Sequence, residues 1–261
     1  MNSIQYSVLT YSPSVFTNER INLGVFFYDT NDNRSIFRHT MNWKRVSAFD
    51  EEINMDFLRA YLNDVAEELS SSNASKLNWS AFLGRFVNEM KFTKPTLIKT
   101  DNAEEFIDQT MKIQLRYDYE KSERPTFDEQ KKYAKSYLKS INIKYNTKNI
   151  FGKFNESIGF DYMINDFGFK HFEFSNKNIN RMFATVHCWR DIARDLNDST
   201  KIYFIYDDDV SDESSELYDE ILSLMKDSNA TVLNMNQAID KFNELRSECD
   251  KRQIGVNELC S

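Results

Sequence analysis

The alternation of apolar and polar residues predicts strands at the start of the chain. Residues 5–11 and 21–28 are rich in β-branched and aromatic side chains, a composition that is typical of strands. The Asp, Thr and Asn residues over 29–33 form a tight turn signal, and residues 34–40 again have strand character. We therefore expect the second and third of these strands to form a β-hairpin.

The segments that follow have the period of helices. Apolar residues recur every three to four positions over 55–69. The predicted buried face of this helix comprises Phe57, Leu58, Tyr61, Leu62, Val65 and Leu69. Further helices are expected over 79–90 and over 101–117, the latter capped by Asp101 or Asn102.

A polar stretch over 118–127 interrupts this periodicity and carries Pro125. Few contacts cross an exposed polar linker, so we place a domain boundary there. Residues 1–117 are then an α+β module, residues 118–127 a linker, and residues 128–261 a second domain.

Helices and strands alternate in the second domain. Residues 128–141 predict an amphipathic helix, in which Ala134, Tyr137, Leu138 and Ile141 share one face. The elements expected after it are strands over 158–165 and 167–175, a helix over 178–196, a buried strand over 201–206, a helix over 214–226, a strand near 230–235 and a helix over 236–250. This alternation implies βαβ connections, so the predicted fold class is α/β with a central mixed sheet.

Composition excludes several classes of protein. Only 6 of 261 residues are Gly and 3 are Pro, which argues against collagen, Pro-rich linkers and Gly-rich phosphate loops. Apolar residues at 41% and aromatic residues at 14% exclude an intrinsically disordered chain. The three cysteines lack C-x-x-C spacing, so neither a zinc ribbon nor a disulfide framework is expected. Without a signal-peptide pattern or a long apolar run, we expect a cytoplasmic protein that does not contact a membrane.

Charge is unevenly distributed along the chain. The net charge is −8, and residues 201–261 alone contain 14 acidic and 6 basic side chains. Residues 130–155, in contrast, contain no Asp or Glu. The basic residues of this stretch are Lys131, Lys132, Lys135, Lys139, Lys144, Lys148 and Lys153. The simplest interpretation is a solvated helix face followed by a loop, and the alternative is a surface that binds a phosphate backbone.

Several separated motifs in the first half resemble those of a bacterial family. The matching positions are Tyr6, Tyr11 and Pro13 in the opening strand, Glu19, Arg20, Asn22, Gly24, Val25 and Asp29 in the hairpin, and Trp43 and Arg45 after it. Over roughly residues 5–117 the chain resembles domain of unknown function 3037. The resemblance implies a compact α+β module and no known chemistry.

Two features of these motifs have a physical interpretation. Gly24 within a strand predicts a close approach of another group to the backbone, or a bulge. Glu19, Arg20 and Asn22 are expected to form a polar cluster with Arg45. This cluster is either a structural ion pair with turn caps or a face that binds a ligand or partner.

The element order of the second half resembles the restriction-endonuclease-like, or PD-(D/E)XK, superfamily. In that superfamily an Asp on one strand and a Glu/Asp-x-Lys on the next meet at a split in the sheet and hold Mg²⁺. The resemblance implies that Asp161 and Glu173 are catalytic carboxylates that bind Mg²⁺, with Glu156 as an additional ligand. The metal would polarise a scissile phosphate, and the basic stretch together with Arg181 would hold the nucleic acid.

The sequence departs from this pattern at the lysine. Ser175, which is neutral, stands where the superfamily has Lys. Lys177 has the same strand parity and is the leading replacement for the catalytic lysine. Lys170, which a regular strand directs to the opposite face, and Arg181 on the next helix are the other candidates. Either the cation has migrated to one of these positions or the site is degenerate.

Other polar residues near this motif carry weaker expectations. His171 shares its predicted strand face with Glu173 and is a candidate hydrogen-bond donor to a bound phosphate. His187 is expected to be a core residue of its helix. The three acids at 207–209 follow a buried strand, where we expect a solvated cap; the alternative is a metal site.

Two functions are compatible with these observations. The first is a cytoplasmic protein that interacts with nucleic acid through a nuclease-like domain, active with Mg²⁺ or degenerate, in conflicts between bacteria and mobile elements. The alternative is a non-enzymatic adaptor or inhibitor that binds a nucleic-acid-handling protein, with the acidic segment 207–220 mimicking DNA. Homo-oligomerisation and the role of the first module stay open.

Overall fold

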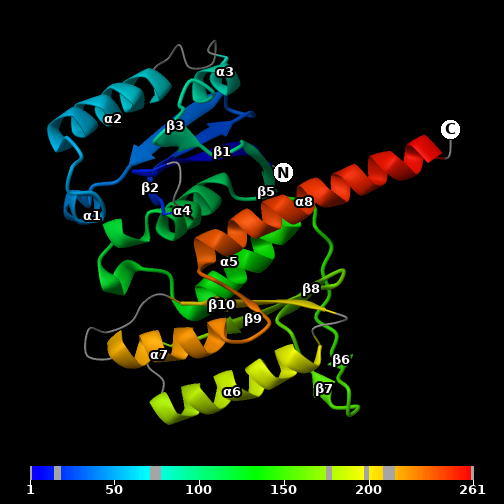
Figure 1. Cartoon of the computed structure of the whole chain (residues 1–261). Coiled ribbons are helices and arrows are strands. Elements are labelled where there is room, and N and C mark those ends of the chain that lie inside the picture. Colours follow the sequence, from blue (N-terminus) through cyan, green and yellow to red (C-terminus); the bar gives the residue numbers. More distant parts are fainter. Residues whose placement is uncertain are drawn as a thin grey trace. The chain divides into compact units, whose positions relative to one another are not determined.

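The computed structural model describes residues 2–14, 19–70, 78–174, 178–196, 200–207 and 215–259. The chain folds into two compact units, Met1–Thr126 and Phe127–Ser261, each with its own sheet and core (Figure 1). The division falls at the end of the 118–127 segment, beside two short 3-10 turns, η2 (Arg116–Asp118) and η3 (Lys121–Glu123). Both units combine helices with strands, so the predicted α/β fold class is confirmed.

The first unit is built on a five-stranded antiparallel sheet. Its strands are β1 (Asn2–Tyr11), β2 (Ile21–Asp29), β3 (Arg34–His39), β4 (Met90–Phe92) and β5 (Thr96–Thr100). β1 is central, because β2 pairs along one of its edges while β4 and β5 pair in succession along the other. The predicted hairpin is formed by β2 and β3, and Asn33, with a φ of 55°, lies in its turn.

Helices cover both faces of this sheet (Figure 1). They are α1 (Trp43–Phe49), α2 (Met55–Ser70), α3 (Trp79–Leu83) and α4 (Ala103–Gln114). The side chains that α2 buries in the core lie at helical spacing and are Leu58, Leu62, Val65 and Leu69. α4 packs on the opposite face, where the ring of Phe106 meets that of Tyr6. Asn102, one of the two predicted caps, accepts a hydrogen bond from the Glu105 amide.

Gly24 is a position where no other residue fits without a shift of its neighbours. A β-carbon there would lie 2.7 Å from the ring of Phe37 and 3.0 Å from the carbonyl oxygen of Arg38. The pairing of β1 with β2 is also irregular at this point, because Leu9 lies opposite Gly24 while Thr10 lies opposite Asn22. The close approach and the bulge predicted from the sequence are both confirmed.

Two expectations for this unit are wrong in detail. The helix expected over 79–90 ends at Leu83, and the chain enters the sheet at Met90 because that edge of β1 is available for pairing. Phe57 was expected on the buried face of α2, but 63% of its surface is exposed. It lies beside the buried stripe and stacks on Tyr61 instead, with ring centroids 5.9 Å apart.

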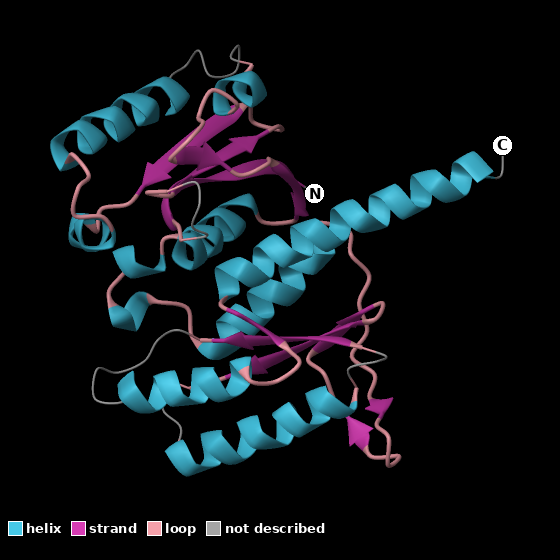
Figure 2. Ribbon diagram, viewed as in Figure 1, coloured by secondary structure: helices cyan, strands magenta, loops and turns pink. Residues whose placement is uncertain are grey.

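The second unit has a four-stranded mixed sheet between two layers of helices (Figure 2). The strand order is β11 (Thr231–Leu233), β10 (Lys201–Tyr206), β9 (Phe167–Phe172) and β8 (Tyr162–Ile164). β9, β10 and β11 are parallel, and β8 is antiparallel to β9. The helices are α5 (Phe127–Ser140), α6 (Ile179–Asp195), α7 (Ser215–Lys226) and α8 (Met235–Leu259). None of the helices in the described part of the chain is long and apolar enough to span a membrane.

Each face of this sheet has its own aromatic core. On the side of α6 and α7, Phe172 and Trp189 pack edge-to-face around Phe204, which is fully buried. On the side of α5 and α8, the rings of Tyr162 and Phe169 both contact Phe242. Burial on both faces explains why β10 is a continuous apolar run, as the sequence predicted.

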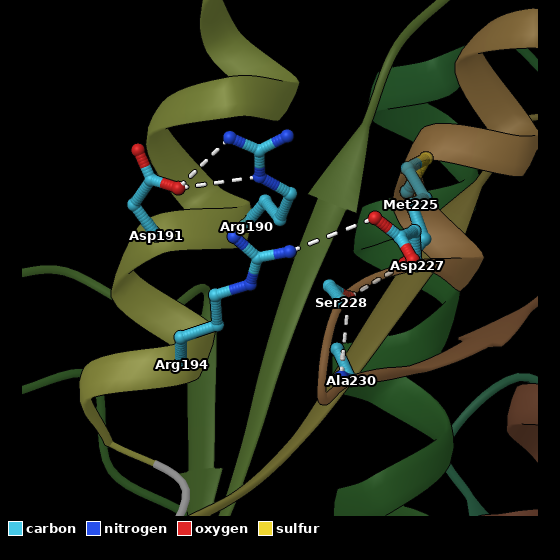
Figure 3. A network of polar contacts seen from close by, with 7 residues as sticks. All are labelled: Arg190, Asp191, Arg194, Met225, Asp227, Ser228 and Ala230. Carbon is cyan, nitrogen blue, oxygen red and sulfur yellow. Dashed lines mark hydrogen bonds and ion pairs between the residues drawn. The ribbon is translucent and has the colours of Figure 1, made fainter.

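Polar contacts add to the packing of α6 against α7 (Figure 3). Arg194, near the end of α6, lies 3.6 Å from the carboxylate of Asp227, which follows α7. In the same turn, the hydroxyl of Ser228 donates to the carbonyl of Met225 and accepts from the amide of Ala230. These contacts hold the connection between α7 and β11 against α6.

Two expectations for the second unit are also wrong. The strand expected over 158–165 is divided by a bend into β7 (Ser157–Ile158) and β8, and β7 pairs with β6 (Ile150–Phe151) in a separate hairpin. His187 was expected in the core, but its side chain is exposed. It directly follows Val186 in the sequence and lies beside the buried stripe that contains Val186 and Trp189.

The burial of α2 leads to a stability prediction. Leu62→Ala leaves a cavity in the core, so it should lower the free energy of unfolding by about 2–5 kcal/mol. Phe57→Ala removes an exposed ring and should cost less than about 1 kcal/mol. Denaturant unfolding of both variants measures this difference. Equal losses would contradict the placement of the buried stripe.

Candidate functional site

A pocket of about 220 Å³ lies where β9 ends. Its walls come from α5, from the end of β9 and the residues just after it, and from the first two turns of α6. The lining residues are Phe127, Lys131, Lys170, His171, Phe172, Glu173, Phe174, Arg181, Met182 and Thr185. In parallel sheets, this carboxyl end of the strands is where ligands usually bind.

Two of the lining lysines hold the carboxylate of Asp161. Lys131 Nζ lies 2.6 Å from Asp161 Oδ1, and Lys170 Nζ lies 3.8 Å from Asp161 Oδ2. The Lys170 ammonium also lies 4.9 Å from the centre of the Trp189 ring. The long side chain of Lys170 therefore reaches the Asp161 carboxylate at the edge of the sheet as well as the Trp189 ring on α6.

Asp161 also completes the hydrogen bonding of β9. Its Oδ2 accepts from the His171 amide at 2.8 Å, at a point where β8 no longer offers a backbone partner. Burial raises the pKa of the Asp161 carboxyl, but the hydrogen bonds from Lys131 and His171 and the charge of Lys170 outweigh it. The pKa is therefore lowered, and Asp161 is a carboxylate at neutral pH.

His171 is buried and neutral. Its Nε2 lies 2.7 Å from the hydroxyl of Tyr162, which is fully buried. Burial is the main cause that lowers the pKa of the imidazole to about 3; Asp161 opposes the shift, and the charges of Lys131, Lys135 and Lys170 add to it. The expectation that His171 donates to a phosphate stays a prediction, and any such donor would be the neutral ring.

Asp207 is a structural residue, and the expectation of a solvated cap at this position is wrong. Only 2% of its surface is exposed. Its Oδ1 accepts from the Phe174 amide at 2.8 Å, and its own amide donates to the Phe172 carbonyl at 3.2 Å. Asp207 therefore continues the pairing of β9 with β10 beyond both strands. The other two acids of the run lie outside the described residues.

Some of the predicted site residues lie at the pocket, some lie outside the described residues, and the others lie elsewhere in the second unit. Glu173 and Arg181 line the pocket with Lys131, and Asp161 lies beside Lys131. Ser175 and Lys177 lie outside the described residues. Of the remaining basic residues, Lys132, Lys135 and Lys139 are on α5, Lys144 and Lys148 follow it, and Lys153 is in the β6–β7 connection.

Glu156, the predicted third metal ligand, belongs to the same β6–β7 connection. Its Oε2 accepts from the amide of Phe154 at 2.8 Å. The carboxylate therefore closes its own turn, and Glu156 is not among the residues that line the pocket.

The surroundings of the Asp161 carboxylate do not fit an Mg²⁺ ion. One oxygen of Asp161 is held by Lys131 and the other by the His171 amide and Lys170. A hard divalent cation needs several oxygen ligands that are not already neutralised by ammonium groups. Within the described ranges, no group of three or more His, Cys, Asp or Glu residues is placed to hold a metal ion. The arrangement is better suited to binding an anion.

Comparison with known proteins finds a family match in the first unit only. Residues 6–118 match the family described as "Protein of unknown function (DUF3037)". The resemblance expected from the motifs over 5–117 is thus confirmed. No curated protein and no solved structure matches the chain. The resemblance of the second unit to the restriction-endonuclease-like superfamily stays a prediction.

Several motif residues of the DUF3037 region bind its last helix and the turn after it. The Asn22 side-chain amide donates to the backbone carbonyl and to the side chain of Gln114. Asp118, the last matched residue, accepts from the Thr40 hydroxyl at 2.6 Å and from the amide of Met41. The Arg45 guanidinium lies 4.8 Å from the centre of the Tyr117 ring. These contacts join residues 114–118, at the end of the matched region, to β2 and to the segment around α1.

The neutral state of His171 leads to a pH prediction. The unfolded chain binds a proton at this imidazole below about pH 6.5, whereas the folded protein resists protonation until about pH 3. Stability should therefore fall as pH drops from 6.5, by up to about 1.4 kcal/mol per pH unit from this group. His171→Gln should remove that component of the pH dependence, measured by denaturant unfolding between pH 7 and pH 4.5.

The control is His187→Gln, which changes an exposed histidine on α6. It should keep the pH dependence of the wild-type protein. If His171→Gln has the same pH dependence as the wild type, the imidazole is not held neutral by the fold.

Proposed function

We propose that the second unit binds nucleic acid, with a phosphate group of the backbone seated in the pocket at the end of β9. The phosphate would contact Lys131, Lys170 and Arg181. The observation that carries the proposal is the convergence of these three cations, from three different elements, on one pocket. No metal takes part in the proposed binding.

The charge balance of the pocket favours an anion. Three cationic side chains and one carboxylate, Glu173, line it, and its histidine is neutral. Asp161 offsets part of the lysine charge, but each ammonium has three N–H donors and only one or two of them are used by Asp161. Charged donors around a small pocket bind phosphate oxygens strongly.

The size of the pocket and the surrounding charge indicate a polymer rather than a free cofactor. A volume of about 220 Å³ is smaller than the pockets that enclose drug-sized ligands, so it suits one phosphate group. The chain from residue 130 to residue 155 adds lysines without any acid, and Lys132, Lys139, Lys144 and Lys148 are exposed. Further phosphates of a backbone would find counter-charges there.

Arg181 provides the clearest test of this proposal. Its side chain is exposed and lines the pocket, so Arg181→Ala should leave the fold intact. Loss of a charged contact to phosphate should weaken binding of a labelled oligonucleotide about tenfold. The slope of log affinity against log salt concentration should fall by about the amount that one phosphate contact contributes. Fluorescence anisotropy at several salt concentrations measures both effects.

The matched control is Arg194→Ala, which removes an exposed arginine from the other end of α6. It should leave binding and its salt dependence unchanged. If Arg181→Ala and the wild-type protein bind the oligonucleotide with equal affinity, the pocket is excluded as a phosphate site.

A metal-dependent nuclease is the second candidate function. The observation in its favour is that Glu173 lines the same pocket as Lys131, which lies against Asp161 and could replace the missing motif lysine. Against it stands the engagement of both Asp161 oxygens by nitrogen donors.

Incubation of single-stranded and duplex DNA and RNA with Mg²⁺ or Mn²⁺ separates the two candidates. Under our proposal the nucleic acid stays intact, because the surroundings of the Asp161 carboxylate do not fit the metal. Cleavage that disappears in Glu173→Ala would instead establish the nuclease. Cleavage that persists unchanged in that variant would come from a contaminant.

The non-enzymatic adaptor with an acidic, DNA-mimicking surface stays a prediction. Its central segment, residues 208–214, lies outside the described residues, and Asp207 is buried. A role in defence or counter-defence likewise stays a prediction.

A further inference from the structure

The hairpin formed by β6 and β7 carries two strongly exposed aromatic rings. Phe151 has 68% of its surface exposed and Phe154 has 79%. Single exposed apolar residues are common on protein surfaces. Two phenylalanines three positions apart on one short hairpin are a local concentration of aromatic surface.

The backbone that carries these rings is held in place. Ile150 pairs with Ile158, which is buried in the core with residues of α6 and α7. Within the connection, the Gly152 amide donates to the Glu156 carbonyl, and the Asn155 amide donates to the Gly152 carbonyl. Asn155 adopts a φ of 62°, which Asn tolerates better than most residues. The rings are therefore presented by an ordered turn.

The cationic residues nearest to the rings in the sequence are exposed lysines. Lys148 and Lys153 are exposed, and the next acid along the chain is Glu156. The Glu156 carboxylate accepts from the Phe154 amide and packs over Gly152, so it is turned into the hairpin. An anionic partner would therefore meet lysines and aromatic rings at this surface.

We propose that the β6–β7 hairpin stacks the bases of single-stranded nucleic acid on Phe151 and Phe154, while Lys148 and Lys153 contact its phosphates. The inference rests on the proposed function, and it adds that the strand is single, because paired bases cannot expose their faces. Exposed aromatic rings among cations are the usual means of binding single strands without sequence preference. The ring faces would accept any base.

Charge complementarity favours nucleic acid over the other partners of an aromatic surface. A hydrophobic protein interface is depleted in lysine at its centre, whereas Lys153 lies between the two phenylalanines in the sequence. An anionic membrane surface would also attract lysines and aromatic rings. The test therefore includes lipid vesicles.

The experiment compares the full-length protein with the double variant Phe151→Ala, Phe154→Ala. A labelled oligothymidylate and a duplex of the same length are titrated by anisotropy. The wild-type protein should prefer the single strand, and the double variant should lose about fivefold or more of that affinity for each ring removed. Its affinity for the duplex should change little.

Three controls define the contact. Phe57→Ala removes an equally exposed phenylalanine from the first unit and should have no effect. Phe151→Leu with Phe154→Leu keeps apolar surface without flat rings and should bind the single strand as weakly as the alanine variant. Phe154→Trp should retain or strengthen binding, because a larger ring stacks better.

The outcomes distinguish this inference from the pocket proposal. Single-strand affinity that is unchanged in the alanine variant, but reduced by Arg181→Ala, overturns the hairpin and supports the pocket. Single-strand affinity that is reduced in the alanine variant, but unchanged by Arg181→Ala, supports the hairpin and excludes the pocket. Absence of any nucleic-acid binding by the wild type overturns both. The protein is also mixed with vesicles of phosphatidylserine and phosphatidylcholine. If the phenylalanines are needed for vesicle binding, but the alanine variant binds oligothymidylate as well as the wild type does, the hairpin is a membrane-binding surface.

Discussion

The ion pair between Lys131 and Asp161 joins the main parts of the second unit. Lys131 belongs to α5, while Asp161 precedes the edge strand β8 and accepts a hydrogen bond from the His171 amide of β9. One carboxylate therefore connects a helix to two strands. Only 10% of the Asp161 side chain is exposed, and a carboxylate buried to that degree without cations would be costly. Folding itself thus requires positive charge at the end of β9, and the pocket is built around that charge.

Asp161 and Asp207 have equivalent roles on the two sides of β9. Asp161 accepts from the His171 amide on the β8 side, and Asp207 accepts from the Phe174 amide on the β10 side. Each carboxylate replaces a backbone carbonyl that the neighbouring strand does not supply. In the sequence, an acid at the end of a buried strand resembles a metal ligand or a solvated cap. In the structure, it completes the sheet, and the charged groups that line the pocket are Lys131, Lys170, Arg181 and Glu173.

The sequence predicts those features that depend on local periodicity. The positions of α2, α5, α6, β9 and β10 follow from it, because one stripe or one continuous run must be buried. Periodicity does not predict whether a residue at the margin of a buried stripe is itself buried or exposed, as Phe57 and His187 show. Each lies next to a buried position, and small rotations of the helix decide on which side of the boundary it falls.

Features that depend on distant pairing could not be predicted in this way. β4 exists because an edge of β1 is open some eighty residues earlier in the chain, and the contact of Lys131 with Asp161 spans thirty positions. The resemblance of the element order to the nuclease superfamily implies one metal site for Asp161 and Glu173, but it does not indicate that Asp161 pairs with Lys131. The basic stretch near residue 131 is evident in the sequence, but only the folded chain shows that Lys131 lines the pocket while Lys132 is exposed.

The net charge of −8 would oppose the binding of a polyanion only if charge acted over the whole molecule. At physiological ionic strength, interactions between exposed charges are largely screened beyond about 8 Å. An approaching phosphate therefore responds to the groups within that distance. At the pocket the cations Lys131, Lys170 and Arg181 outnumber the carboxylates Glu173 and Asp161, and at the hairpin Lys148 and Lys153 outnumber Glu156. The acids of residues 201–261 lower the rate of long-range encounter, while the affinity at contact is set by these local cations and by the rings of the hairpin.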